Sequence, residues 1–131
     1  MISKAHFILY VVDQERSRRF YEAVLGEEPI LHVPGMTEFA LPGGSALGLM
    51  PIAGIRRLLG DALPCPGAAS GTPRCELYLT VEDPEALHQR AIRAGAQELS
   101  PLQPRNWGDD AAYSLDPDGH VLVFARPSSL S

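Results

Sequence analysis

Two side chains that can bind a metal ion or move a proton, His6 and Glu76, occupy equivalent places in an internal repeat. An offset of 70 residues (76 − 6) superimposes them and aligns the apolar residues that follow. These are Phe7, Leu9 and Val11 in the first copy and Leu77, Leu79 and Val81 in the second. Imidazole and carboxylate groups bind divalent metals, and a carboxylate with a raised pKa is a general base, so Glu76 is a candidate for that role. The repeat predicts a strand-then-helix unit that is used twice.

Composition limits the classes of partner. The 131 residues suit one domain, and 11 basic against 16 acidic residues give a net charge of −5. Nucleic acid is excluded as a predicted partner because it requires a broad basic face. Lys4 and His6 interrupt the N-terminal apolar stretch and no later run reaches a membrane span, so we expect no membrane association and a cytoplasmic location. Cys65 and Cys75 lack further cysteines nearby and are predicted to be free thiols.

The first copy, module one, covers residues 1–53. A β-favouring run predicts a strand over 6–12, and Asp13 precedes a helix over 15–25 that ends at Gly26. Turn residues then separate short strands at 28–33, 38–41 and 46–51. The predicted order of module one is therefore β-α-β-β-β.

A linker or lid over residues 54–74 joins the two copies. It starts with a short helical segment within 53–63, but residues 64–73 are rich in proline and glycine and are predicted to form no helix. Module two covers residues 75–126, with a strand at 76–81, a helix from Pro84 that stops near Gly95, and strands around 98–99, 111–115 and 120–125. The tail, 127–131, is expected to be frayed.

The fold class is α+β, with two tandem β-α-β-β-β modules that form a curved mixed sheet around a ligand cup. Alternation along the strands assigns one apolar face to the helices. That face holds Phe7, Leu9, Val11, Leu47, Leu49, Leu77, Leu79, Val81, Leu122 and Phe124. The opposite, concave face holds His6, Tyr10, Glu76, Tyr78 and Thr80. The alternative is that these polar and aromatic residues only face solvent.

Several motifs carry a family resemblance. Val11-Val12-Asp13, the Ser-Arg-Arg-Phe-Tyr run at 17–21, Leu25-Gly26 and the Asp-Pro-Asp-Gly-His run at 116–120 resemble the vicinal-oxygen-chelate superfamily. This superfamily includes glyoxalase I, fosfomycin-resistance transferases, extradiol dioxygenases and bleomycin-resistance proteins. The resemblance covers nearly the whole chain and implies paired modules that curl around a central cavity. It does not single out one function, because the superfamily spans several chemistries.

The resemblance also implies where a divalent metal would bind in the metal-dependent members. Carried over to this chain, those positions are His6, Gly48, Glu76 and Val123. His6 and Glu76 match the ligand types, whereas glycine and valine offer no lone pair. A catalytic metal needs about three protein ligands, so we predict no metal cofactor unless a partner chain or the ligand's own oxygens complete the set.

Aromatic residues give the better candidate site. Trp107 lies in a turn-rich segment, 104–109, which resembles the loop that brings an aromatic side chain to the cavity of drug-binding relatives; Tyr113 follows it. Phe39 aligns with Tyr113 at an offset of 74 (113 − 39) and is expected to be its counterpart. The predicted ligand-binding residues are His6, Tyr10, Phe39, Met50, Glu76, Tyr78, Arg105, Trp107 and Tyr113, with Arg105 and Glu76 setting the polarity. The alternative for Trp107 is that it only plugs one end of the sheet.

The sequence favours a binding protein over an enzyme. The predicted function is that of a metal-free, homodimeric protein of bleomycin-resistance type that holds a small, flat or amphipathic organic molecule. One alternative is a metal-dependent lyase or dioxygenase of glyoxalase type, which would use His6, Glu76 and a further ligand. Another is a non-catalytic interaction domain whose concave face contacts a protein.

Overall fold

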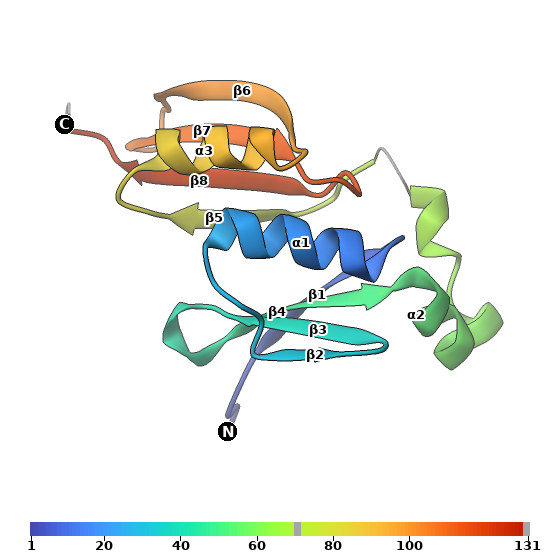
Figure 1. The fold of residues 1–131 in the computed structure, drawn as a ribbon. Coiled ribbons are helices and arrows are strands. Elements are labelled where there is room, and N and C mark those ends of the chain that lie inside the picture. Colours follow the sequence, from blue (N-terminus) through green and yellow to red (C-terminus); the bar gives the residue numbers. More distant parts are fainter. Residues whose placement is uncertain (70–71, 130–131) are drawn as a thin grey trace. The chain divides into compact units, whose positions relative to one another are not determined.

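The computed structural model describes residues 1–69 and 72–129 (Figure 1). The chain divides into two compact units, one with residues 1–22 and 26–70, the other with residues 23–25 and 71–131. We call them unit 1 and unit 2 and describe each by itself.

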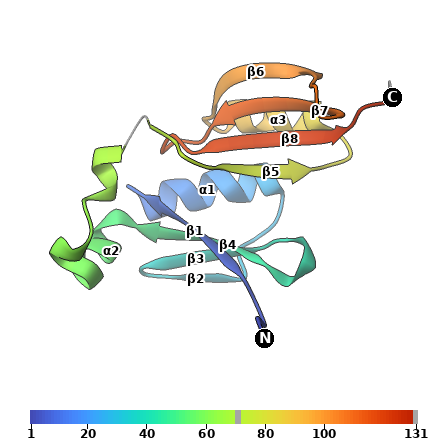
Figure 2. The ribbon, with the colours of Figure 1, turned by 180° about the vertical axis from the view of Figure 1, so that it is seen from behind.

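Unit 1 contains a four-stranded mixed sheet. Its elements are β1 (His6–Val11), α1 (Gln14–Leu25, whose last three residues belong to unit 2), β2 (Leu31–Val33), β3 (Met36–Ala40), β4 (Ala46–Pro51) and α2 (Ile52–Leu59). The strand order is β1-β4-β3-β2, in which β1 and β4 are parallel and the other neighbours antiparallel. Figure 2 shows the β2–β3 hairpin at one edge of this sheet.

Unit 2 repeats this arrangement. Its elements are β5 (Glu76–Thr80), α3 (Pro84–Arg93), β6 (Gln97–Pro104), β7 (Asp109–Leu115) and β8 (Val121–Pro127). The strand order is β5-β8-β7-β6, with β5 and β8 parallel, and α3 packs against β6, β7 and β8. The predicted α+β class and the two tandem β-α-β-β-β modules are confirmed, with the strands divided between two four-stranded sheets.

The repeat extends to the helix starts. Asp13 Oδ1 accepts a hydrogen bond of 3.0 Å from the Arg16 N–H, and Asp83 Oδ1 accepts one of 3.1 Å from the Ala86 N–H. Each aspartate thus satisfies a backbone donor that the first helical turn leaves free. Gly26 ends α1 with a φ of 71°, a left-handed conformation that favours glycine.

The closing strands are buried on both faces, since Gly48 and Val123, which alternate with the predicted core residues, are buried as well. Leu47, Leu49, Leu122 and Phe124 are all fully buried. The prediction for the first strand is only partly right, because Val11 is buried whereas Phe7 is 64% exposed. Phe7 lies near the start of the edge strand β1, whose one neighbour in the sheet is β4.

Two local predictions are corrected. Residues 66–69, expected to form no helix, make a short 3-10 turn (Pro66–Ala69). The strand expected around 98–99 runs from Gln97 to Pro104. Its pairing with β7 shifts register twice, and such irregularities let an edge strand accommodate Pro101, which has no N–H to donate.

The end of the described chain is hydrogen bonded. β8 continues through Pro127, one residue beyond the expected end of module two, and the Ser128 N–H donates to the Gly108 carbonyl oxygen at 2.8 Å. Residues 130–131 of the tail expected to fray lie outside the described residues. Cys65 and Cys75 are free thiols, as predicted. Within the described ranges, no helix combines the length and apolar character needed to cross a membrane.

Candidate ligand-binding site

The open face of unit 2, opposite α3, presents a row of three residues across three strands. Tyr78 of β5 pairs with Val123 of β8, which pairs in turn with Tyr113 of β7. Directly paired residues lie on the same face of a sheet, so the two rings flank one valine. Val123 is fully buried in a small apolar cluster with Ala111 and Ala125, and both tyrosines pack against it. The result is an apolar floor with an aromatic ring at each side.

The β6–β7 turn adds an indole to this face. The Nε1–H of Trp107 donates to the Tyr78 hydroxyl oxygen at 2.9 Å, and the Tyr78 O–H donates to Asp109 Oδ2 at 2.5 Å. Trp107 remains 53% exposed. The two hydrogen bonds fix the edge of an indole whose ring is still accessible to a ligand.

Arg105 holds this turn in place. Its Nε and Nη2 donate to the Ala111 carbonyl oxygen at 3.2 and 2.8 Å, and Nη2 also contacts Ser100 Oγ at 2.9 Å and the Pro101 carbonyl oxygen at 3.1 Å. The guanidinium carbon lies 5.1 Å from the centre of the Tyr113 ring, within the range of a cation–π contact. Arg105 therefore ties together β6, β7 and the turn that carries Trp107.

The surroundings keep both tyrosines protonated. Burial, and then the hydrogen bond to Asp109, raise the pKa of Tyr78 above its ordinary value of 10.0. Burial and the negative charge of Glu76 raise the pKa of Tyr113, and the charge of Arg105 opposes this effect. At neutral pH the site therefore offers phenols and not phenolates.

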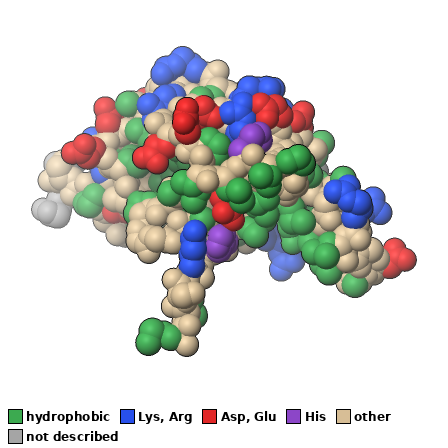
Figure 3. Space-filling view, turned by 60° about the horizontal axis from the view of Figure 1, so that its bottom comes forward, with side chains coloured by type: hydrophobic (Ala, Val, Ile, Leu, Met, Phe, Trp, Pro, Cys, Tyr) green, Lys and Arg blue, Asp and Glu red, His purple; other side chains and the backbone are tan. Residues whose placement is uncertain are grey.

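Unit 1 presents a different open face. His6 Nδ1 lies 3.0 Å from Glu38 Oε2, and Tyr10 of β1 pairs with Met50 of β4. Ile8, Leu31 and Val33, which strand pairing places on the same face as Glu38 and Gly48, are exposed apolar side chains. Figure 3 shows hydrophobic side chains gathered on the face it views, with histidine and acidic side chains among them. The face combines an imidazole–carboxylate pair with an apolar surface.

The closing strands do not fit the metal site that the resemblance implies. A Cβ atom added at Gly48 would lie 3.0 Å from Ile8 Cγ1 and 3.2 Å from Met36 Sδ, so the neighbours already fill this position. Val123, its counterpart, is buried among apolar side chains. Across residues 1–69 and 72–129 the structure groups no three His, Cys, Asp or Glu side chains in a way that could hold a metal ion.

The structure brings together many of the predicted site residues. Five of them lie in unit 2. Tyr78, Arg105, Trp107 and Tyr113 are neighbours in the cluster just described, and Glu76 lies on the same face of β5 as Tyr78. His6, Tyr10 and Met50 share the open face of unit 1. Whether any of them binds a ligand stays a prediction.

Phe39 is a correction. It pairs with Leu47 and is 1% exposed, so it belongs to the buried face of unit 1. The true counterpart of Tyr113 is Glu38. Tyr113 pairs with Val123 and Glu38 pairs with Gly48, and these two partners occupy equivalent positions of the closing strands. An offset of 75 (113 − 38), which also relates Val123 to Gly48, would have found it.

Asp109, the acceptor of the Tyr78 hydroxyl, is not among the site residues predicted from the sequence. The two residues are 31 positions apart, and the sequence carries no local pattern that links them. Only the fold of the β6–β7 turn brings the carboxylate to the ring.

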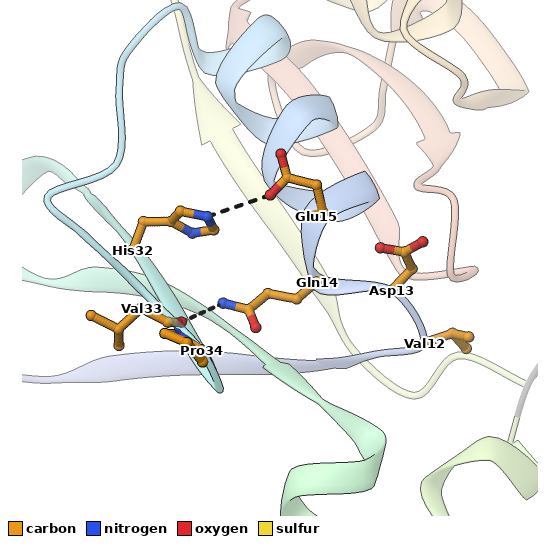
Figure 4. Close-up of a pocket in the computed structure, with 7 residues that line it drawn as sticks. All are labelled: Val12, Asp13, Gln14, Glu15, His32, Val33 and Pro34. Atoms are coloured by element: carbon orange, nitrogen blue, oxygen red, sulfur yellow. Dashed lines mark hydrogen bonds and ion pairs between the residues drawn. The ribbon is translucent and has the colours of Figure 1, made fainter.

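A separate hollow of about 570 Å³ lies in unit 1, lined by residues 12–15 and 32–34 (Figure 4). Gln14 Nε2 donates to the Val33 carbonyl oxygen at 2.8 Å, and His32 Nε2 lies 3.4 Å from Glu15 Oε2. These groups are directed at each other and join the first turn of α1 to the β2–β3 hairpin. The contacts are structural in character.

Two tandem β-α-β-β-β units, each with an open sheet face, define a class of paired-module proteins. This chain belongs to the Glyoxalase/Bleomycin resistance protein/Dioxygenase superfamily, whose family model matches residues 4–124. The predicted family resemblance is confirmed.

Individual relatives agree with this assignment. An uncharacterised protein of Mycobacterium bovis is 30% identical over 128 residues, which cover 91% of this chain and 80% of that protein. The crystal structure of a glyoxalase-related enzyme from Fulvimarina pelagi is 26% identical, with a TM-score of 0.80, and the match covers 93% of this chain and 86% of that one. A glyoxalase/bleomycin resistance protein/dioxygenase family enzyme from Burkholderia phytofirmans has a TM-score of 0.81 at 19% identity, covering 95% and 98% of the two chains, and supports the fold alone.

Proposed function

We propose that this chain is a metal-free small-molecule-binding protein of bleomycin-resistance type, which holds a flat organic ligand without transforming it. The observation that carries the proposal is the anchored indole of Trp107, half exposed beside Tyr78. A rigid aromatic surface loses little conformational freedom when a flat molecule stacks on it. Stacking contributes about 0.5–1.5 kcal/mol for each aromatic pair beyond the buried area.

The apolar floor supports the same proposal. Small-molecule sites are lined mostly by apolar and aromatic side chains with a few polar groups that fix orientation. On the open face of unit 2, the two tyrosines, which pack over the fully buried Val123, supply the apolar part, and Glu76 and Asp109 supply the polar part. A metal is not needed for such binding, and Gly48 and Val123 offer none of the ligands that the resemblance would require.

Intrinsic fluorescence tests the proposal directly because Trp107 is the only tryptophan of the chain. We expect a saturable change in its emission with at least one member of a panel of planar aromatic compounds. Prior treatment with a chelator should leave the binding curve unchanged. Binding that appears only after addition of Ni²⁺, Zn²⁺, Mn²⁺ or Fe²⁺ would favour the metal-dependent lyase or dioxygenase instead.

Two tyrosine variants make the test specific. Tyr78→Phe removes the acceptor of the indole N–H, so we expect about fivefold weaker binding by calorimetry, the equivalent of one hydrogen bond of about 1 kcal/mol. Tyr113→Phe is the matched control, since no hydrogen bond to its hydroxyl is found within the described part of the chain, and it should bind normally. The proposal fails if no compound binds, or if Trp107→Leu binds the best compound as tightly as the wild type.

We also propose that the protein is a homodimer. The sheet of unit 1 has the strand order β1-β4-β3-β2. On its open face the side chains of Ile8, Leu31 and Val33 are exposed together. Contiguous exposed apolar side chains of this kind mark interaction sites. A second copy that covers this face would remove them from water.

A further inference from the structure

The β2–β3 hairpin has little support from the sheet of unit 1. β2 is three residues long, all three are exposed, and the strand lies at the edge of the sheet with β3 as its neighbour. A strand this short makes few ladder hydrogen bonds, and a two-stranded hairpin is marginally stable by itself in water. Contacts outside the sheet therefore have to hold the hairpin in place.

One side chain of α1 supplies several of these contacts. Gln14 Nε2 donates to the Val33 carbonyl oxygen at 2.8 Å and to Thr37 Oγ1 at 2.9 Å. Gln14 Oε1 accepts a hydrogen bond of 3.0 Å from the Gly35 N–H. Figure 4 shows the amide directed at Val33. These bonds reach β2, the turn and β3, so a single amide binds the hairpin at three points.

His32 of β2 adds a second link to α1. Its Nδ1 lies 2.8 Å from Thr37 Oγ1, and its Nε2 lies 3.4 Å from Glu15 Oε2. The Thr37 hydroxyl is fully buried and accepts the bond from Gln14, so its own hydrogen can be donated to His32 Nδ1. Thr37 thus connects the amide and the imidazole in one network.

The network orients two residues of the proposed dimer face. His32 is directed at α1, and alternation along β2 places its neighbours Leu31 and Val33 on the opposite, open face. A loose hairpin would have to become ordered when a second copy binds, and such ordering weakens association. A hairpin already fixed by α1 avoids this cost.

We propose that Gln14 is a positioning residue of the dimer face. It holds the β2–β3 hairpin in the conformation that a second copy binds, and it acts through Leu31 and Val33. This inference rests on the proposed homodimer and goes further by naming the side chain that sets its affinity.

Gln14→Met tests the inference because it keeps the length of the side chain and removes all three hydrogen bonds. In dilute, monomeric protein, hydrogen exchange at the backbone amides of residues 30–38 should become about tenfold faster, while exchange in unit 2 stays unchanged. The dimer dissociation constant, measured by analytical ultracentrifugation, should rise about fivefold, the effect of one net hydrogen bond.

Two further comparisons make the test specific. Gln89→Met is the matched control, because the hydrogen bond of this exposed side chain goes to Glu85 of its own helix, α3. It should change neither hairpin exchange nor the dissociation constant. Thr37→Val removes the acceptor with little change of shape and should reproduce part of the effect, whereas Thr37→Ser keeps the hydroxyl and should dimerise like the wild type.

The outcomes separate the inference from the homodimer. If the wild type dimerises and Gln14→Met leaves the dissociation constant or the hairpin exchange unchanged, the inference is wrong and the homodimer stands. Equal acceleration of exchange in unit 2 would make Gln14 a general stabiliser and also overturns the inference. A wild type that stays monomeric overturns both.

Discussion

At the scale of single residues, Asp116 organises the turn between β7 and β8. Its Oδ1 accepts hydrogen bonds of 2.9 Å from the backbone N–H groups of Asp118 and His120, and its Oδ2 lies 2.9 Å from His120 Nδ1. The carboxylate is buried while the imidazole is partly exposed. The Asp-Pro-Asp-Gly-His run at 116–120, which contributed to the family resemblance, is therefore a turn closed by the Asp116 carboxylate.

This turn should make stability depend on pH. Burial alone lowers the pKa of His120, but the hydrogen bond and charge of Asp116, with the charge of Asp118, outweigh burial and raise it above 6.5. A raised pKa in the folded state means that the stabilisation is fully present below pH 6.5 and is lost as the pH rises through the raised value. In Asp116→Asn we expect the pKa of His120 to fall and this pH dependence of urea unfolding to flatten.

Proton NMR titration of the His120 ring provides the measurement, with assignment by His120→Gln. Asp118→Asn is the matched control, because Asp118 acts on the imidazole by charge alone and should lower the pKa less. A pKa of His120 that stays raised in Asp116→Asn would contradict the assignment of the shift to this pair.

At the scale of elements, strand β4 depends on a glycine. Gly48 pairs with Ile8 of β1 and with Glu38 of β3, and it is buried. Glycine normally weakens a strand interior and often marks a close approach. Here the side chains of Ile8 and Met36 close over it, which explains why this strand has no room for the carboxylate expected from the resemblance.

Gly48→Ala should therefore destabilise unit 1. A Cβ at 3.0 Å from Ile8 Cγ1 overpacks the strand, so we expect the free energy of unfolding to fall by about 1 kcal/mol in urea. The loss should shrink in an Ile8→Ala background, as a double-mutant cycle would show. Gly54→Ala in α2 is the control, since its nearest atom lies at 3.6 Å, and it should stabilise by about 0.5–1 kcal/mol. Unchanged or higher stability of Gly48→Ala would refute the argument.

At the scale of the whole molecule, the proposed homodimer makes a direct prediction. Light scattering coupled to gel filtration should give twice the chain mass of 14.2 kDa. Val33→Lys places a charge on the exposed apolar face of unit 1 and should raise the dimer dissociation constant roughly tenfold, since burial of one valine contributes about 1.5 kcal/mol. Leu58→Lys changes an exposed apolar residue of α2 and should leave the dimer intact. A monomeric mass, or equal effects of the two variants, would count against a dimer through this face.

The repeat by itself determined the two modules and most of their elements. Helix starts at Asp13 and Asp83, the stop at Gly26 and the alternation of β5 all depend on interactions within a few residues, so local patterns suffice to predict them. The same alternation placed Glu76 and Tyr78 on one face. The sequence therefore predicted the architecture and the aromatic part of the candidate site.

Tertiary structure alone decided the partners of the charged groups. Glu38 beside His6, Asp109 beside Tyr78 and the carbonyl oxygens around Arg105 come from other strands or turns. Phe39 shows why such pairs escape prediction: a shift of one residue in register moves a side chain to the opposite face of a sheet. Register depends on how whole strands pair, which local sequence does not specify.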